Sequence, residues 1–392
     1  MSQTKAQLVS GTTAQDLTVD NINTTSINSG QTSGRKNLII NGAIQVAQRG
    51  TSSTVNGFGS VDRFKTSCAG TDELPTHAQA DVASGTTPYT LGFRKSYKLT
   101  NGNQTGGAGA DDRIEIQHLI EAQDIANSGW NYTSASSFIT FSFWIKSSVA
   151  QEFFIRFQTQ DGTQYRYKTG TSSLSADTWT KITKTIPGNS NLQFDNDVNA
   201  GLRISFYAFA GTNYSDSSAT DTWAANETGN RTSDMTSTWY TTNDATFEIT
   251  GVQLEVGSTA TDFEHRSFAQ ELALCQRYFQ ILSSNTSGGL NAHSRYPALG
   301  NGTNSAIWYC YHKQTMRVKP SLVLNNITST TVEVFNYSTS GGCTFQSASM
   351  AEGDENHSQI NIATTGGLTT ASIACWRFSV NGNCHWAVNS EL

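Results

Sequence analysis

The stretch FEITGVQLEVGSTATDFEHRSFAQELALCQRYF, residues 247–279, decides the fold. Its first part alternates apolar and polar residues, but Phe247 and Ile249 have one parity whereas Val252 and Leu254 have the other. A β-bulge at Gly251 would turn both sets toward one core, because one extra residue reverses the alternation of faces. We therefore expect a long, buried, bulged strand at this point of the chain.

The second part of the stretch changes to a helical period. Apolar residues recur at steps of four and three, and Ser267 precedes them as an expected N-cap. They are Phe268, Leu272, Cys275, Phe279 and Leu282. This 3.5-residue period is typical of a coiled-coil seam, yet two heptads are too short to associate alone. The pattern by itself slightly favours a helix that packs on its own sandwich.

Upstream segments show the period of two that is typical of half-buried strands. FITFSFWIKSS (138–148) and GLRISFYAFAG (201–211) place aromatic and aliphatic residues on one face, and QEFFIRFQTQDG (151–162) does the same before an Asp161-Gly162 hairpin turn. Many antiparallel strands separated by Gly, Asn and Ser turns predict a mainly β fold with a jelly-roll β-sandwich.

These patterns divide the chain into four predicted segments. Residues 1–36 contain no aromatic residue, and they are expected to be either a disordered tail or an arm that orders only against a partner. Residues 37–262 form the jelly-roll sandwich and residues 263–285 the helix. Residues 286–392 alternate again between SGG and NGN turns, and we expect a smaller all-β C-terminal domain there.

Composition excludes several classes of function. The 392-residue chain is 36% hydrophobic, 10% aromatic and 14% charged, with a net charge of −6. A nucleic-acid surface needs a basic excess, which is absent here. No apolar run approaches the ~20 residues of a membrane span, and the first residues have no apolar core of a signal peptide. We therefore expect neither a nucleic-acid partner nor membrane insertion.

The six cysteines do not indicate a disulfide scaffold in a chain of this length. Four of them, Cys310, Cys343, Cys375 and Cys384, lie in the last quarter without any C-x-x-C pair. A zinc site built on Cys384 and His385 is one interpretation, but zinc clusters usually show tight ligand pairs. We favour buried free thiols, and we expect no metal and no cofactor.

No complete sequence motif for catalysis is present. H-E-x-x-H, G-x-S-x-G and P-loop patterns are absent. Five acidic residues cluster between positions 111 and 124 and include Glu115 and Glu121, so they offer a pair for glycan hydrolysis. Clustered acids on a strand or loop are far commoner than a glycosidase pair, and we expect no enzyme.

Sugar binding is easier to support, because aromatic faces stack on sugar rings within a frame of polar side chains. The candidate ligand-binding residues are Trp223 and Trp239 in the sandwich and Trp308, Tyr309, Tyr311, His312, His385 and Trp386 in the C-terminal domain. For each tryptophan the competing interpretation is a core or interface aromatic.

Several blocks in constant order carry a family resemblance. They are NLIINGAIQVAQRGTS (37–52), GSVDRF (59–64), RIEIQHLIEAQDI (113–125), FITFSFWIKSS, TWTKITKTIPG (178–188), the opening stretch and TMRVKPSL (315–322). Together, from about Asn37 to Pro320, they resemble a family of bacteriophage tail-fibre and virion structural proteins. The resemblance implies a viral protein located in the virion.

Proteins of that family are homotrimers, anchored to the particle by an N-terminal segment and presenting distal β-domains to the host. The resemblance therefore implies that residues 1–36 dock on a phage tail or capsid protein. It also implies that Phe268, Leu272, Cys275 and Phe279 face a threefold axis, and that the tail fibre binds host cell-surface polysaccharide during adsorption. The alternatives are a capsid decoration or structural fibre without receptor binding and, less favoured, a glycan depolymerase.

A second likeness lies within the first. A jelly roll that begins Asn-Leu-Ile with Asn-Gly shortly after, and ends in a strand like FEITGVQLE, is similar to several carbohydrate-binding modules. In those modules acidic residues near both segments help to hold a structural calcium. Here the corresponding residues are Ala43, Ile44, Gln45, Thr250 and Gly251, which lack the carboxylates that calcium prefers.

Overall fold

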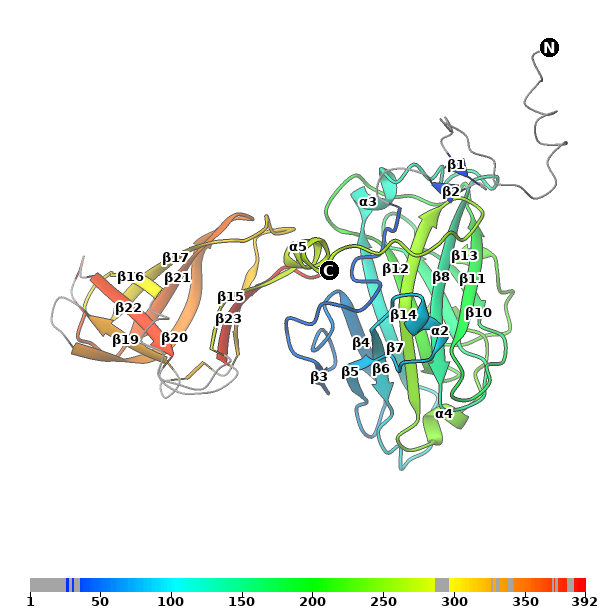
Figure 1. Ribbon diagram of the computed structural model, residues 1–392, viewed down its shortest axis with the longest axis horizontal. Helices are drawn as coiled ribbons and strands as arrows, with labels where there is room; N and C mark the ends of the chain where they lie inside the picture. Colours follow the sequence, from blue (N-terminus) through cyan, green and yellow to red (C-terminus); the bar gives the residue numbers. More distant parts are fainter. Residues whose placement is uncertain are drawn as a thin grey trace, which may run out of the picture.

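Two β bodies lie on either side of one helix, α5 (Phe268–Gln276), in the computed structural model (Figure 1). The structure describes residues 26–27, 30–31, 36–285, 296–325, 327–328, 332–336, 341–368, 370, 373–378 and 384–392. Most of the predicted arm over 1–36 lies outside these residues, apart from β1 (Ser26–Ile27) and β2 (Gly30–Gln31), which pair antiparallel. The predicted domain boundaries stay predictions, apart from the extent of the helix within 263–285.

The larger body is a sandwich of two six-stranded antiparallel sheets. The first sheet contains, in spatial order, β13 (Trp223–Ala225), β10 (Tyr165–Gly170), β9 (Phe154–Thr159), β12 (Ala200–Ala210), β7 (Arg113–Glu121) and β4 (Phe64–Ala69). The second contains β11 (Thr180–Pro187), β8 (Phe138–Ser147), β14 (Thr246–Val256), β6 (Lys95–Thr100), β5 (Thr76–Asp81) and β3 (Ser52–Ser53). The predicted fold class, mainly β with a jelly-roll sandwich, is confirmed.

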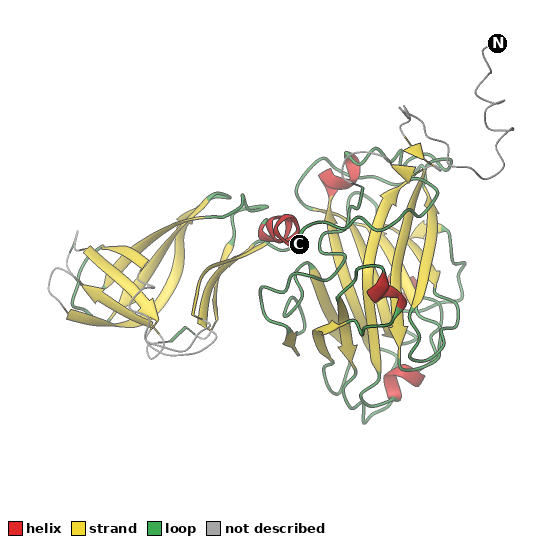
Figure 2. Ribbon diagram, in the orientation of Figure 1, coloured by secondary structure: helices red, strands yellow, loops and turns green. Residues whose placement is uncertain are grey.

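Helices contribute little to this body (Figure 2). The short ones are α2 (Thr87–Thr90), α3 (Ala122–Ala126), α4 (Thr238–Thr241) and the 3₁₀ turn η1 (Thr228–Asn230). Figure 2 shows α3 and α4 at opposite ends of the sandwich. None is long enough to shape the core, which is therefore built by the strands.

An aromatic cluster joins the two sheets at the centre of the sandwich. Phe141 of β8 packs edge-on against Phe157 of β9 with ring centroids 5.1 Å apart, and Phe143 packs on Phe206 of β12 at 5.0 Å. All four rings are fully buried. Edge-to-face packing at this separation adds about 0.5–1.5 kcal/mol to the burial of each pair, so the inner parity of these strands is fixed.

The bulge predicted in β14 is confirmed. Pairing of β14 with β8 shifts register between Thr250 and Gln253, and Gly251 adopts φ +60°. Both apolar sets, before and after the bulge, are buried. The predicted hairpin is also present, since Asp161 and Gly162 join β9 to β10, and Gly162 adopts φ +55°.

The expected helix over 263–285 is wrong in its extent. It begins as predicted, with the Ser267 hydroxyl accepting a hydrogen bond from the Gln270 amide at 3.3 Å. It ends at Gln276, and the following residues form strand β15 (Phe279–Asn285). This strand pairs with β23 (Cys384–Asn389), a partner more than one hundred residues away. Hydrogen bonds between the two strands therefore replace the helix that the local sequence period predicted.

The predicted coiled-coil seam is corrected at two of its four positions. Cys275 is fully buried against Ile40 and Val46 of its own sandwich, and Phe279 is buried beneath the guanidinium of Arg49, 3.7 Å from the ring centroid. Neither side chain is available to a threefold axis. Leu272 is partly buried in the same cluster, and Phe268 is 56% exposed, so an interface there stays a prediction.

The smaller body consists of a three-stranded sheet and a closed barrel. The sheet contains β15, β23 and β18 (Ser321–Asn325). The barrel contains β16 (Tyr296–Gly300), β17 (Ser305–Tyr311), β21 (His357–Thr364), β20 (Gly341–Gly353), β19 (Val332–Asn336) and β22 (Ile373–Phe378). A cluster of tryptophans fills its core, with Trp308 edge-on and Trp386 tilted to Trp376, each within 5 Å by ring centroid.

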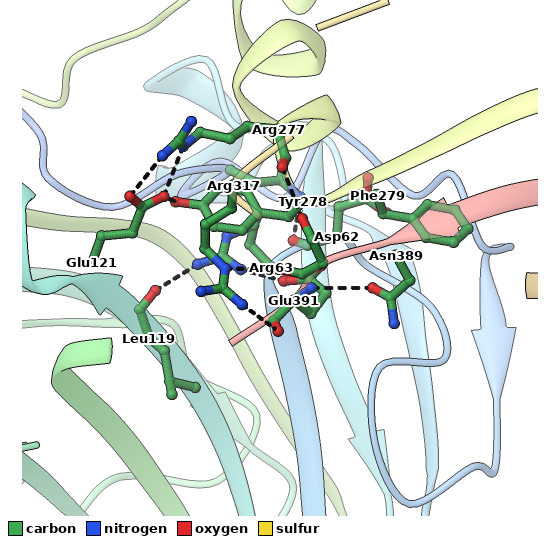
Figure 3. Close-up of polar contacts among 12 residues, drawn as sticks. Asp62, Arg63, Leu119, Glu121, Arg277, Tyr278, Phe279, Arg317, Asn389 and Glu391 are labelled. Carbon is green, nitrogen blue, oxygen red and sulfur yellow. Dashed lines mark hydrogen bonds and ion pairs between the residues drawn. The ribbon is translucent and has the colours of Figure 1, made fainter. Parts of the chain in front are cut away.

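A polar junction fixes the smaller body to the sandwich (Figure 3). Arg277 donates two hydrogen bonds to the Glu121 carboxylate, at 2.8 and 2.9 Å, and Tyr278 donates a third at 2.5 Å. Near the chain end, Glu391 forms ion pairs with Arg63 and Arg49. Because Glu121 and Glu391 are buried, these charges are largely shielded from water and hold the two bodies in one arrangement.

Candidate functional site

The outer face of the first sheet carries a row of polar side chains. The core-facing residues of β7, such as Ile114 and Ile116, are fully buried, so Glu115 and Gln117 project from the opposite face. Cross-strand pairing places Gln117 beside Lys65 of β4 and Ser205 of β12, and Ser205 beside Arg156 of β9. Four neighbouring strands therefore contribute one continuous polar row.

This row forms the floor of a groove of about 430 Å³. Its lining residues are Lys65, Ser67, Arg113, Glu115, Gln117, Arg156, Gln158, Gln164, Arg203, Asn226, Thr228 and Arg231. All of them have polar or charged side chains, which is unusual, since most small-molecule sites are lined mainly by apolar residues. The groove is thus built for a ligand rich in hydrogen-bonding groups.

The charge of the lining is strongly asymmetric. Five cationic side chains, from one lysine and four arginines, surround a single carboxylate, Glu115. The chain as a whole has a net charge of −6. The groove is therefore a positive site on an otherwise acidic protein, and it attracts anions where the rest of the surface repels them.

Glu115 is held ionised by its neighbours. Burial raises its pKa, but attraction by Arg156 and by Arg113 outweighs burial and holds the pKa below its ordinary value. The guanidinium of Arg113 lies 3.1 Å from the carboxylate. Glu115 therefore neutralises part of the positive charge and leaves the remaining cations uncompensated.

The remaining arginines are crowded. Burial lowers the pKa of Arg203, and repulsion by Arg156 lowers it further. Burial likewise lowers the pKa of Arg231, which is also repelled by Arg156 and Arg113. Guanidinium groups remain charged at neutral pH despite such shifts, so the crowding is unfavourable until an anion enters.

Several buried polar atoms in and beneath the floor have no hydrogen-bond partner within the described part of the chain. The donors include Nε of Arg156, a residue that is only 2% exposed, and the hydroxyl of the fully buried Tyr207, and the acceptors include both carboxylate oxygens of Glu115. Burial raises the pKa of Tyr207 to about 12, so the hydroxyl keeps its proton and can donate it. Buried polar groups in native proteins are nearly always paired, so Arg156, which lines the groove, is suited to pair with a ligand.

Asn226, Thr228 and Arg231 line one side of the groove, and the loop that precedes them is held down by buried cations. Lys168 forms an ion pair with Asp216, and Arg166 donates a hydrogen bond to the Ser218 hydroxyl at 2.6 Å. Farther along, Tyr214 lies near two lining arginines, with guanidinium-to-centroid distances of 5.1 Å for Arg113 and 4.7 Å for Arg231. The groove is therefore formed before any ligand arrives.

A larger hollow of about 740 Å³ lies beside α5, but its charged groups already have partners. Arg266 pairs with Glu264 at 2.8 Å, and Arg277 pairs with Glu121. These contacts hold the helix to the sandwich. The groove on the first sheet is the better candidate site because its cations exceed its anions.

Four of the predicted sugar-stacking residues are in the core. Trp239 and Trp386 are fully buried, Trp308 is 5% exposed and Trp223 is 9% exposed. The indole N–H groups of Trp223 and Trp239 donate to the carbonyls of Pro187 and Thr246. The prediction that these tryptophans contact a ligand is therefore wrong, because their ring faces pack against protein.

The other predicted residues lie on or near the barrel surface. Tyr309 is 55% exposed and Tyr311 is 85% exposed, and both project from the same face of β17. His312 is held by the Glu355 carbonyl at 2.8 Å and the Ser358 hydroxyl at 2.9 Å, whereas His385 lies edge-on to Phe279. The structure brings the two tyrosines together, and their contact with a ligand stays a prediction.

The metal and thiol predictions have different outcomes. Among the described residues no group of three His, Cys, Asp or Glu side chains could hold a metal ion. Cys343 and Cys375 are buried, but the side chain of Cys384 lies outside the described residues, so the zinc alternative with His385 stays untested. Near the segment compared with calcium sites, the carbonyls of Ile44 and Gln45 accept hydrogen bonds from the Gln79 amide.

The acidic cluster does not assemble into a pair across the groove. Asp111 accepts a hydrogen bond from Asn213, Asp112 accepts one from the Gly109 amide, and Glu121 pairs with Arg277 at the junction. Glu115 is the one carboxylate among the residues that line the groove. The described part of the chain contains no helix long and apolar enough to cross a membrane.

Sequence reasoning missed the lining arginines although their signal is present. In RIEIQ, FIRFQ and LRISFY, the inner parity is apolar and the outer parity carries Arg113, Arg156 and Arg203. An arginine therefore occupies an outward-facing position in each of three strands, which is uncommon on a sheet face that only contacts water. The pairing of β7, β12 and β9 was needed to show that these residues are neighbours.

Comparisons with known proteins give distant structural likenesses. No known family profile and no curated protein matches the sequence. Solved structures similar to this chain include the enzymatically active domain of tailspike protein 4 from bacteriophage CBA120, with 12% identity, 56% of this chain covered and a TM-score of 0.31. This chain spans 21% of that tailspike domain's length.

Carbohydrate-binding modules are also among the similar structures. A family 4 module is 14% identical, with 55% of this chain and 97% of the module covered and a TM-score of 0.29. A tandem pair of family 22 modules from Paenibacillus barcinonensis is 9% identical, with 91% and 98% covered and a TM-score of 0.26. At these TM-scores the likenesses carry no argument about function.

Proposed function

We propose that this chain is a virion fibre protein of a bacteriophage and that its sandwich binds a host cell-surface polysaccharide in the groove on the first sheet. The observation that carries the binding proposal is the continuous polar row across β4, β7, β12 and β9. The family resemblance over residues 37–320 supports the fibre proposal.

A saccharide suits the chemistry of the groove. Glutamine, asparagine, serine and threonine side chains donate and accept hydrogen bonds, which matches hydroxyl groups that do both. The lining provides Gln117, Gln158, Gln164, Asn226 and Thr228 in addition to the charged residues. An apolar cofactor would lose water from these groups without gaining partners for them.

Binding without cleavage fits the lining. Glycoside hydrolysis commonly uses two carboxyl groups about 5 to 9.5 Å apart across the scissile bond. The groove offers Glu115 alone, and its carboxylate is already paired with Arg113. We therefore propose a non-catalytic binding role, in which release of reducing ends from a bound glycan is not expected.

The virion role adds two proposals about assembly. Residues 1–36 would attach the protein to a phage tail or capsid protein. Three copies would associate around Phe268 and the exposed side of α5, because Phe268 is a large apolar residue left 56% exposed. Three grooves on one fibre would strengthen weak glycan binding through effective concentration.

The binding proposal is tested on an array of bacterial capsular and lipopolysaccharide glycans. The full-length chain is compared with a groove variant, Gln117→Ala/Gln158→Ala, and with a barrel variant, Tyr309→Ala/Tyr311→Ala. We expect the groove variant to lose binding and the barrel variant to keep it. The reverse result would move the site to the barrel tyrosines, and binding to no glycan would favour the decoration alternative.

The assembly proposal is tested by native mass from light scattering on a sizing column. We expect a trimer for the full-length chain, a trimer for a version that lacks residues 1–36, and a monomer for Phe268→Ser. A monomeric full-length chain would contradict trimerisation in solution. A trimeric Phe268→Ser variant would place the interface away from the start of α5.

A further inference from the structure

We propose that the groove selects an acidic polysaccharide, one that carries carboxylate, sulfate or phosphate groups along its chain. This inference rests on the proposed function of the same groove, and it specifies the class of glycan. It is carried by the excess of cations over carboxylates in the lining and by the unpaired Nε of the buried Arg156.

The charges of the groove do not balance without a ligand. Glu115 is the one carboxylate of the lining and attracts both Arg156 and Arg113. Lys65, Arg203 and Arg231 line the same space, so cations exceed anions there. Arg203 and Arg231 both lie close enough to Arg156 to be repelled by it. An anion placed among them would replace this repulsion with attraction, whereas a neutral sugar would leave it in place.

The centre of the floor has the geometry of an anion receptor. Arg156 lies between Ser205 on one neighbouring strand and Lys168 on the other, with its guanidinium 5.6 Å from the Tyr207 ring centroid. Its Nε is a donor without a partner among the described residues. A planar guanidinium binds carboxylate, sulfate or phosphate through two parallel hydrogen bonds, so Arg156 is the expected primary contact.

The cations are spread rather than gathered at one point. Lys65 on β4 and Arg156 on β9 are three strand spacings apart in the sheet, which is about 14 Å. Arg231 lies outside the sheet, on the wall of the groove. This distribution suits a chain with charges on successive sugars better than a single phosphate ion.

A nucleic acid is the competing polyanion, and the aromatic side chains disfavour it. Proteins that bind single strands without sequence preference stack bases on exposed aromatic rings. Tyr207 is fully buried, and the ring of Tyr214 is already near Arg113 and Arg231. The face of the sheet that lines the groove therefore provides hydrogen bonds and charge but no free stacking platform.

The test compares matched charged and neutral polymers by affinity electrophoresis and calorimetry on the full-length chain. The pairs are polygalacturonate with its methyl ester and dextran sulfate with dextran, and oligo-deoxythymidine is the nucleic-acid probe. We expect polygalacturonate or dextran sulfate to bind at least about tenfold more tightly than its neutral partner, and the affinity to fall as salt rises.

The variants separate a charge effect from a folding effect. Arg156→Gln is expected to weaken binding of the acidic polymer about tenfold, and Arg156→Lys to restore only part of it, because lysine cannot bind an anion bidentately. Arg94→Gln, a surface arginine that stacks on Tyr89 outside the groove, is the control and should not change binding. If Arg156→Gln does not fold, the less buried Arg203→Gln and Arg231→Gln test the same charge effect.

Each outcome decides between the two proposals. Tighter binding of either acidic polymer, lost in the arginine variants, supports the inference, and the preferred polymer identifies carboxylate or sulfate as the recognised group. Binding of neutral polymers that is lost in the groove variants overturns the inference and leaves the proposed function intact. Binding to none of the polymers overturns both, and equal or tighter binding of oligo-deoxythymidine overturns recognition of a glycan.

Discussion

Asp62 is the residue whose titration should be easiest to detect in the stability of the fold. It is fully buried beneath the junction, and burial raises its pKa to about 6 although Arg49 and two hydrogen bonds from Gln48 oppose the rise. Glu391 raises the pKa further. The folded protein therefore binds this proton more tightly than the unfolded chain does.

The first prediction concerns the pH dependence of Asp62→Asn. The folded pKa of Asp62 lies above the unfolded value of 3.8. The contribution of Asp62 to the unfolding free energy of the wild-type protein therefore falls as pH rises from about 4 to about 6, and then stays constant. Asp62→Asn should remove this fall, a difference on the order of 1–3 kcal/mol in unfolding free energy. Urea denaturation at pH 4 to 8 measures it.

A surface carboxylate provides the control for this experiment. Asp81 forms an exposed ion pair with Lys95, so Asp81→Asn should leave the wild-type pH profile nearly unchanged. Parallel wild-type and Asp62→Asn profiles across this pH range would show that Asp62 is not preferentially protonated in the folded state.

At the residue scale the sequence predicted chemical types better than positions. For each tryptophan the sequence left two interpretations open, sugar binding or a place in a core. The four tryptophans lie in the core. Trp308 and Tyr309 are neighbours in sequence, yet one is 5% and the other 55% exposed. Adjacent residues of a strand face opposite sides, so Trp308 faces the core and Tyr309 faces outward. Which set of a strand in a barrel faces the core cannot be assigned until the pairing of the strands is known.

At the scale of elements, the bulged strand β14 determines how the sandwich closes. Strand β8 pairs with both halves of β14, whereas β6 pairs only with the first half. Gly251 makes the change of phase at φ +60°, a conformation that glycine adopts without strain. The core of the second sheet therefore depends on one backbone conformation.

The second prediction is that Gly251→Ala destabilises the sandwich. A Cβ at this position would lie 2.6 Å from Cζ of Phe93, and the positive φ adds strain. We expect a loss of about 1–3 kcal/mol in unfolding free energy, measured by urea denaturation. Gly229→Ala is the matched control, because its nearest neighbour is 3.8 Å away; an equal loss in both variants would contradict the role of the bulge.

The helix shows where local pattern stops being informative. Ser267 and the first seam residues were correctly placed in a helix, but the same 3.5-residue period continued into a segment that forms β15. Pairing of residues 279–285 with β23 provides hydrogen bonds that a helix end could not. Two heptads could not reveal a partner so distant in sequence.

At the scale of the whole molecule, the junction explains why the two bodies keep one arrangement. Arg317 donates to the Val198 carbonyl of the sandwich at 3.1 Å and to the Ser390 carbonyl at 2.8 Å. Together with Arg277 and Arg63 it connects segments from the start, middle and end of the chain (Figure 3). No local pattern predicts such a set, because its members are hundreds of residues apart.

The third prediction tests the pair at the centre of this junction. Arg277→Ala leaves the buried Glu121 carboxylate with Tyr278 and Gln123 as partners, and we expect a loss of about 3 kcal/mol in unfolding free energy. Small-angle scattering should show a wider range of arrangements of the two bodies.

A second substitution separates the buried charge from the lost contact. Adding Glu121→Gln to Arg277→Ala removes the unpaired carboxylate, so the double variant should recover part of the stability. If the double variant is the less stable of the two, the carboxylate contributes through its other hydrogen bonds rather than through the ion pair. Unchanged scattering in both variants would mean that Arg317 and Glu391 suffice to hold the bodies.

The two connections to the smaller body leave and return at one place. Phe279, where β15 begins, is the cross-strand partner of Asn389, where β23 ends, and the Ser390 amide donates to the Tyr278 carbonyl at 2.8 Å. The chain between them forms the distal sheet and barrel, while the groove lies wholly in the sandwich. The chain therefore leaves and rejoins the junction at one place, and Arg317 adds a contact to the sandwich through the Val198 carbonyl. Because no lining residue of the groove belongs to 280–388, changes in the distal barrel should leave the groove intact.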